Sequence, residues 1–133
     1  RDFAYCDSGM IPWLLVAELL CRTGKSLGQL VSEAIRAYPS SGEINRTVED
    51  ADACLARIEQ VYSAQGAQAD YTDGLSMAFA QWRFNVRKSN TEPLLRLNVE
   101  AKGDRNLMLA RTDELLGIIE NRKANKLTDR ESA

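Results

Sequence analysis

One stretch of the chain gathers several groups that could bind an anion: RKSNTEPLLR, residues 87–96. A guanidinium group pairs with phosphate oxygens through two parallel hydrogen bonds, and a turn adds hydroxyl, amide and backbone N–H donors. The same polar residue types also serve in ordinary hairpin connections. The stretch therefore predicts either a solvated loop or a phosphate pocket. The candidate phosphate-binding residues are Arg87, Ser89, Asn90, Thr91 and Arg96.

Apolar and polar residues alternate on both sides of this stretch, as they do in strands with one buried face. Successive side chains of a strand point to opposite faces of the sheet. Arg87 and Arg96 are therefore expected on the face opposite to the core, one at each foot of the loop. The residues expected in the core are Leu75, Met77 and Phe79, then Trp82, Phe84 and Val86, then Leu95, Leu97 and Val99.

Composition restricts the other chemistry that the chain could perform. It has no histidine, the commonest general base, and its three cysteines (Cys6, Cys21 and Cys54) form no C-x-x-C pair. We therefore expect no metal site and no disulfide framework, and a reducing, cytoplasmic location. A formal charge of −2 argues against nucleic-acid binding by bulk electrostatics. The apolar run 10–21 is too short to span a membrane and contains Glu18.

The elements around the loop predict an α+β fold with two parts. Residues 1–38 hold two helices: one, apolar on nearly all sides and so expected to be buried, ends at Gly24, and the next starts at a Ser26/Gln29 capping box. The stretch YPSSG, residues 38–42, is typical of a linker, and we expect a hinge linker at 39–42. Residues 43–121 predict β-α-β-β-β-α, a four-stranded antiparallel sheet with two helices on one face. Residues 122–133 form a polar tail.

Two segments resemble the α-D-phosphohexomutase family, in particular its bacterial phosphomannomutase/phosphoglucomutase branch. FNVRKSNTEPLLRL is similar to that family's phosphate-binding loop, and RDFAYCDSGMIPWLL to the segment that follows the sugar-recognition loop of its third domain. The order of elements after residue 42 also resembles the family's C-terminal domain. The resemblance runs from Arg1 to about Asn121, and it implies the end of domain 3 followed by domain 4.

The resemblance also implies a function. Members of the family have four domains around a cleft, in which a phosphoserine exchanges phosphate with a hexose phosphate through a hexose 1,6-bisphosphate, assisted by Mg²⁺. Arg87, Ser89, Asn90 and Thr91 would hold the phosphate that is not transferred, and Arg96 would orient them. The chain has no phosphoserine, metal or sugar-recognition loop, so we expect a fragment with no catalytic residue, inactive without the N-terminal domains of its own chain.

Two other classes of function stay open from the residues alone. The chain could be a standalone module for a phosphorylated ligand or single-stranded RNA, or an interaction domain with no ligand. RNA readers place aromatic residues on the open face of a sheet, whereas Trp82 and Phe84 share the face expected to be covered. Within the family, mannose phosphate and glucose phosphate remain equal alternatives as substrates.

Overall fold

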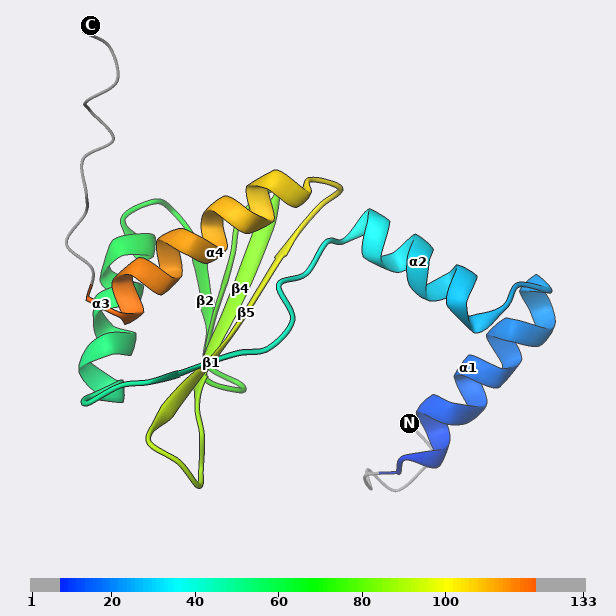
Figure 1. Cartoon of the computed structure of the whole chain (residues 1–133), viewed down its shortest axis with the longest axis horizontal. Coiled ribbons are helices and arrows are strands. Elements are labelled where there is room, and N and C mark those ends of the chain that lie inside the picture. Colours follow the sequence, from blue (N-terminus) through cyan, green and yellow to red (C-terminus); the bar gives the residue numbers. More distant parts are fainter. Residues whose placement is uncertain (1–7, 122–133) are drawn as a thin grey trace, which may run out of the picture. The chain divides into compact units, whose positions relative to one another are not determined.

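The computed structural model describes residues 8–121, which fold into four helices and five strands (Figure 1). The predicted tail and Cys6 lie outside the described residues. The chain divides into two compact units between Arg36 and Ala37. The elements are α1 (Met10–Thr23), α2 (Leu27–Ala37), β1 (Ile44–Thr47), α3 (Ala51–Ser63), β2 (Gln68–Asp70), β3 (Leu75–Ala78), β4 (Trp82–Lys88), β5 (Leu94–Ala101) and α4 (Arg105–Ile119).

The helices of the first unit begin and end where their capping residues predict. Gly24 adopts the left-handed conformation (φ 65°), and its N–H donates to the Leu20 carbonyl at the end of α1. Both halves of the capping box form, since Ser26 N–H donates to Gln29 Oε1 (2.9 Å) and Gln29 N–H donates to Ser26 Oγ (3.3 Å). The expected burial of α1 is wrong for this unit, because none of its residues is buried among the described part of the chain.

The second unit contains a five-stranded antiparallel sheet in the order β1-β5-β4-β3-β2. The α+β class is confirmed, but the predicted count of four strands is wrong. β2 is the additional strand: it pairs with β3 in the register Gln68↔Ala78 to Asp70↔Ser76. All three of its residues are exposed, so it lacks the apolar alternation by which the other strands were predicted.

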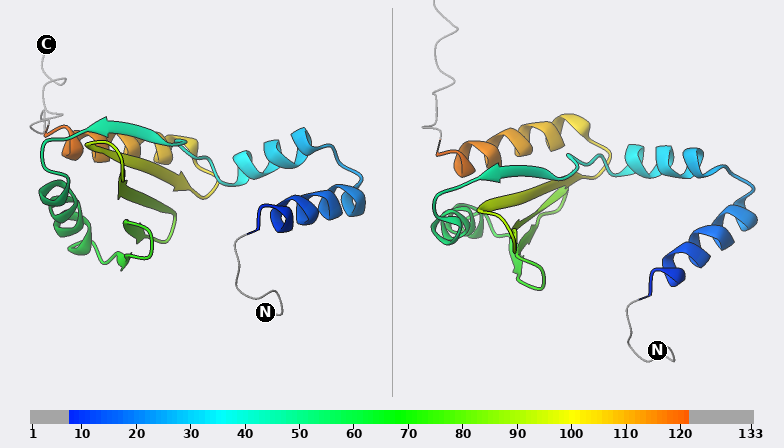
Figure 2. Two further views of the ribbon diagram at one scale, coloured as in Figure 1. Left: turned by 90° about the horizontal axis from the view of Figure 1, so that it is seen from below. Right: turned by 60° about the horizontal axis from the view of Figure 1, so that its bottom comes forward.

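Helices α3 and α4 pack on one face of this sheet (Figure 2). Asp50 and Asp104 cap them, each accepting a hydrogen bond from the backbone N–H three residues later. Val61 follows the helical spacing of the core residues of α3 but is 38% exposed. The core comprises Cys54, Ile58 and Tyr62 of α3; Met108, Leu115 and Ile119 of α4; and Leu75, Met77, Trp82, Phe84, Val86, Leu95, Leu97, Val99 and Ala101 of the strands.

The segment that was predicted as a linker is bonded to β5. Ala101 N–H donates to the Pro39 carbonyl (3.0 Å), and Ser41 N–H donates to the Val99 carbonyl (2.9 Å). The Ser41 hydroxyl in turn accepts a hydrogen bond from Val99 N–H (2.9 Å). Residues 39–41 thus continue the edge of the sheet ahead of β1, and a hinge in this region stays a prediction.

Candidate functional site

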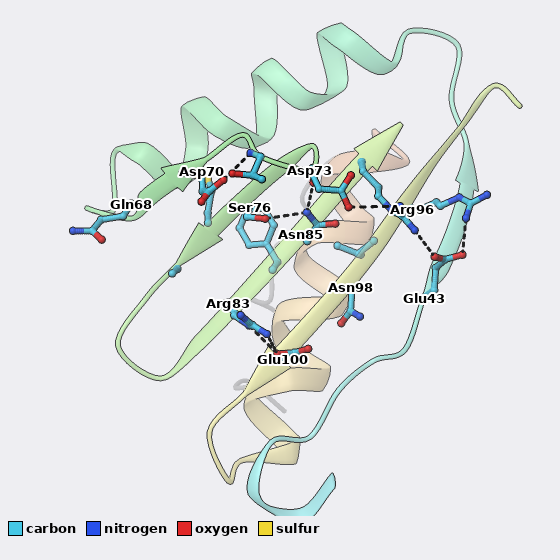
Figure 3. Close-up of a pocket in the computed structure, with 16 residues that line it drawn as sticks. Glu43, Gln68, Asp70, Asp73, Ser76, Arg83, Asn85, Arg96, Asn98 and Glu100 are labelled. Carbon is cyan, nitrogen blue, oxygen red and sulfur yellow. Dashed lines mark hydrogen bonds and ion pairs between the residues drawn. The ribbon is translucent and has the colours of Figure 1, made fainter. Parts of the chain in front are cut away.

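The open face of the sheet, opposite to the helices, carries a shallow polar hollow of about 570 Å³ (Figure 3). Polar side chains of β3, β4 and β5 that alternate with the core residues point into it, as strand parity predicts. The charged residues that line the hollow are Arg83, Arg87, Arg96, Glu43, Asp70, Asp73 and Glu100.

Arg87 and Arg96 lie side by side on this face, close to the loop between β4 and β5. They are direct cross-strand partners in the β4–β5 register, and their side chains are 39% and 32% exposed. Like charges directly opposite each other in a sheet destabilise it, so the pair needs a neighbouring anion. The open-face position predicted for both arginines is confirmed.

Glu43 is the anion that both arginines share. One carboxylate oxygen, Oε2, lies 3.2 Å from Arg87 Nη2, and the other, Oε1, lies 3.4 Å from Arg96 Nη1. Glu43 reaches this face because Ile44, the next residue, packs toward the core. Asp73 adds a second carboxylate, 3.6 Å from Arg87 Nη1. The guanidinium of Arg87 is therefore held between two segments that are distant in sequence.

The turn that carries Asp73 approaches the backbone of β4 closely. Gly74 has φ +74°, and a Cβ there would lie 2.6 Å from both Arg87 Cβ and the Val86 carbonyl oxygen. Only glycine allows this approach without displacing the strand. The Asn85 amide also donates to the Asp73 carbonyl (2.6 Å) and to Ser76 Oγ (2.9 Å), which fixes the turn against the sheet.

The rest of the open face carries its own paired charges. Arg83 and Glu100 form an ion pair across β4 and β5, with 2.7 Å between Arg83 Nη2 and Glu100 Oε2. Nearer the edge of the sheet, a backbone hydrogen bond from Thr72 lowers the pKa of the Asp70 carboxyl below its usual value. Arg83 and Glu100 thus pair with each other and Asp70 accepts from Thr72, whereas Arg96 Nε, which is shielded from solvent, makes no hydrogen bond in the described part of the chain.

The loop between β4 and β5 places its polar groups at the tip of the hairpin. Ser89 is half-buried and its N–H donates to the Leu94 carbonyl (3.0 Å), which closes the hairpin. Ser89 Oγ lies 3.4 Å from both the hydroxyl and the backbone nitrogen of Thr91. Asn90 is exposed, and within residues 8–121 its side chain makes no hydrogen bond. The loop thus offers an amide and two hydroxyls.

The feet of this hairpin are fixed to the rest of the second unit. Lys88 Nζ lies 2.8 Å from Asp52 Oδ1 in the first turn of α3. On the other side of the loop, the Pro93 carbonyl accepts a hydrogen bond from Val48 N–H (3.3 Å). The loop is therefore an exposed tip on an anchored base.

Sequence analysis found some of these residues and not others. Parity brought Arg87 and Arg96 to one face, and the structure places them together; Ser89, Asn90 and Thr91 lie beside them in the chain but do not line the hollow. Glu43 and Asp73 were missed as partners of Arg87. The apolar residue Ile44 could have indicated the direction of Glu43, whereas the approach of Asp73 depends on tertiary packing.

Two further properties concern the described residues only. In residues 8–121 no three His, Cys, Asp or Glu side chains come together as a metal site would require. No helix within that range has both the length and the apolar composition needed to cross a membrane.

The sequence is similar to proteins of known name along most of its length. The phosphomannomutase of Salmonella montevideo is 59% identical over 119 residues, which are 90% of this chain and 26% of that protein. The phosphomannomutase of Escherichia coli K12 is 57% identical over the same share. A protein of Xanthomonas campestris pv. campestris named "Phosphohexose mutases" is 56% identical and is covered to 27%. The chain thus spans about a quarter of the length of the curated relatives that it matches.

Two family models match the chain on either side of residues 39–42, close to the boundary between its two compact units. The model described as "Phosphoglucomutase/phosphomannomutase, alpha/beta/alpha domain III" matches residues 1–38, which include α1 and α2. The model described as "Phosphoglucomutase/phosphomannomutase, C-terminal domain" matches residues 43–116, which include the whole sheet, α3 and most of α4. Since that second match alone covers more than half of the chain, the chain belongs to the phosphoglucomutase/phosphomannomutase family.

Proposed function

We propose that this chain forms the C-terminal part of a phosphohexomutase and holds the phosphate of a hexose phosphate that is not being transferred. The observation that carries the proposal is the convergence of Arg87 and Arg96 on one shared carboxylate at the foot of the hairpin loop. Two guanidinium groups that already face a common anion match the charge and donor geometry of a phosphate group.

Each site residue has a defined chemical role in this proposal. Arg87 provides the two-pronged contact, and Arg96 holds it in orientation and supplies additional positive charge. Ser89, Asn90 and Thr91 add neutral donors from the loop tip, whose base is anchored by Lys88 and Pro93. None of these groups makes or breaks a bond. They position the substrate, so that the reacting phosphate meets catalytic groups provided elsewhere.

The arrangement of domains is part of the same proposal. Residues 1–38 would complete the third domain of the enzyme, a bend at the end of α2 would allow closure, and residues 43–121 would form the anchoring domain. The substrate is mannose phosphate or glucose phosphate, and the reaction moves phosphate between O1 and O6. Names of the relatives, phosphomannomutase and phosphohexose mutase, support this class of reaction.

Magnesium, hexose 1,6-bisphosphate and a cytoplasmic location belong to the proposal as properties that the family implies. The metal would assist phosphate transfer to and from a phosphoserine, and the N-terminal domains of the same chain would hold both. The RNA-binding alternative is not favoured, because Trp82 and Phe84 are buried under the helices.

The proposal is tested by kinetics of the complete enzyme with Arg87→Ala. Charge-assisted hydrogen bonds contribute about 1.5–3 kcal/mol each, so loss of the guanidinium is expected to lower kcat/KM by about 10- to 100-fold or more. Phosphorylation of the active-site serine by the bisphosphate should still occur. Arg83→Ala is the matched control, since Arg83 lies on the same face and pairs with Glu100. Equal kcat/KM in wild type and Arg87→Ala would contradict the proposal.

A further inference from the structure

We propose that Glu43 is a placeholder for the bound phosphate: its carboxylate occupies the site between Arg87 and Arg96 when the site is empty, and it leaves when a phosphate arrives. The inference rests on the proposed function, because it concerns the same pair of arginines. It adds a residue that competes with the ligand and thereby sets its affinity.

The geometry of Glu43 supports this role. Its two carboxylate oxygens contact different guanidinium groups, 3.2 Å and 3.4 Å away. One anion therefore bridges the arginines of two neighbouring strands. A phosphate bound by both arginines would need the same place between them. Glu43 cannot stay there as well, because two anions in contact repel each other.

The lengths of these ion pairs show that the contacts are loose. Charge-assisted hydrogen bonds between nitrogen and oxygen are usually about 2.7–2.9 Å long. Arg83–Glu100 (2.7 Å) and Lys88–Asp52 (2.8 Å) have that length in this structure. The contacts of Glu43 and the 3.6 Å contact of Asp73 with Arg87 are all longer. A loosely held carboxylate of a 44% exposed side chain can rotate into solvent at little cost.

The charge balance of the face gives the placeholder a function. Four carboxylates and three guanidinium groups line the hollow, so the empty face is not cationic. Glu43 keeps the directly opposed arginines from repelling each other while no ligand is bound. The same carboxylate makes the site selective, since a weak or singly charged anion would not displace it as readily as a phosphate dianion.

The position of Glu43 in the chain is also relevant. It follows directly after residues 39–41, which are bonded to β5, and it precedes β1. Gly42, the residue before it, has φ +68°. The bonded segment on one side and β1 on the other therefore hold the backbone of Glu43 in place, so that release of the carboxylate requires a side-chain rotation alone.

The test is a titration of the ¹⁵N-labelled 133-residue chain with inorganic phosphate at constant ionic strength. The variants are Glu43→Gln and Glu43→Ala. We expect each to lower the phosphate Kd by about three- to tenfold, which corresponds to roughly 0.7–1.4 kcal/mol. Glu100→Gln is the matched control, because it removes the same charge from the same face but frees Arg83 instead. Its Kd should stay within about twofold of wild type.

The outcomes distinguish the placeholder role of Glu43 from the existence of the phosphate site. An unchanged or higher Kd in both Glu43 variants, with core amide signals like those of wild type, would overturn the placeholder role alone. An equal gain in Glu100→Gln would also overturn it, because the effect would then be one of net charge. If wild type shows no saturable shifts near Arg87, the proposed phosphate site itself fails, and the placeholder role fails with it.

Discussion

At the scale of single residues, the orientation of Arg87 depends on partners from two other segments. Glu43 and Asp73 contact its guanidinium from either side, and Asn85 fixes the turn that carries Asp73. The guanidinium is therefore partly ordered before any ligand binds. Ordering a long side chain costs free energy on binding, and a preordered arginine avoids part of that cost. For Glu43 this gain is opposed by its competition with phosphate, and the lower Kd expected in the Glu43 variants means that the competition is the larger effect.

The first prediction at this scale concerns the kind of cation at position 87. Arg87→Lys should not restore the activity lost in Arg87→Ala, because an ammonium group is a single point of charge and cannot form two parallel hydrogen bonds. The kcat/KM of the lysine variant of the complete enzyme should remain within about tenfold of the alanine variant. Activity close to that of wild type would mean that charge alone suffices.

The second prediction concerns Gly74. Gly74→Ala places a Cβ 2.6 Å from the Val86 carbonyl oxygen in a left-handed conformation, so both a clash and backbone strain follow. We expect a loss of about 3 kcal/mol or more in the free energy of unfolding, measured by urea denaturation. Gly66→Ala is the control, because it shares the positive φ but has open space around it. It should lose only about 1–2 kcal/mol. Equal losses would show that the close approach has no cost.

Residue patterns predicted only part of the site. Alternation of apolar residues along β4 and β5 determines the face of Arg87 and Arg96, because period-two patterns are local. The ion pair with Asp73 depends on a turn 14 residues away along the chain, brought near by the β3–β4 pairing. A local pattern of residues does not show that these two segments lie close together in space. Contacts between segments that are distant in sequence need the fold before they can be assigned.

At the scale of elements, the sequence predicted helices α3 and α4 because each has an apolar face at helical spacing. The strand β2 was missed because it is short and fully exposed. Val61 fits the helical period of the apolar face of α3, yet it is 38% exposed. Periodicity shows which face of a helix is apolar, but not how much of that face the neighbouring elements cover.

The prediction for this scale compares two positions of α3. Ile58 is fully buried in the core beneath the sheet, whereas Val61 is partly exposed. Ile58→Ala should lower the free energy of unfolding by about 2–5 kcal/mol, because it leaves a cavity in a packed core. Val61→Ala, on the same helix, should cost less than about 1 kcal/mol. Urea denaturation measures both values, and a reversed order would contradict the assigned core.

At the scale of the whole chain, the location of a hinge follows from what the segment before β1 is bonded to. Residues 39–41 share backbone hydrogen bonds with β5, and Gly103 N–H donates to the Ala37 carbonyl (2.8 Å). Rotation within 39–41 would break these bonds. We therefore expect residues 37–41 to move with the sheet and the bend to lie next to Ala37, nearer to α2 than the composition of YPSSG suggests.

Hydrogen exchange tests this expectation. The amides of Ser41 and Ala101 should exchange as slowly as those in the middle of β5, because their hydrogen bonds belong to the same sheet edge. The amides in the middle of β4, which pairs with β3 and β5, serve as the internal reference. Exchange at Ser41 and Ala101 that is several orders of magnitude faster than at those amides would place the hinge within 39–42 instead.

The central claim is that Arg87, Arg96 and the adjoining loop form one phosphate site. The most direct measurement is a phosphate titration of the ¹⁵N-labelled chain, observed at the amides of Ser89, Asn90 and Thr91 and at the Nε of both arginines. The account predicts saturable shifts at all five positions with one Kd, on the order of millimolar, and loss of the shifts at the four remaining positions in Arg87→Ala. Shifts that do not saturate, or that persist unchanged in Arg87→Ala, would leave residues 89–93 as an ordinary hairpin connection.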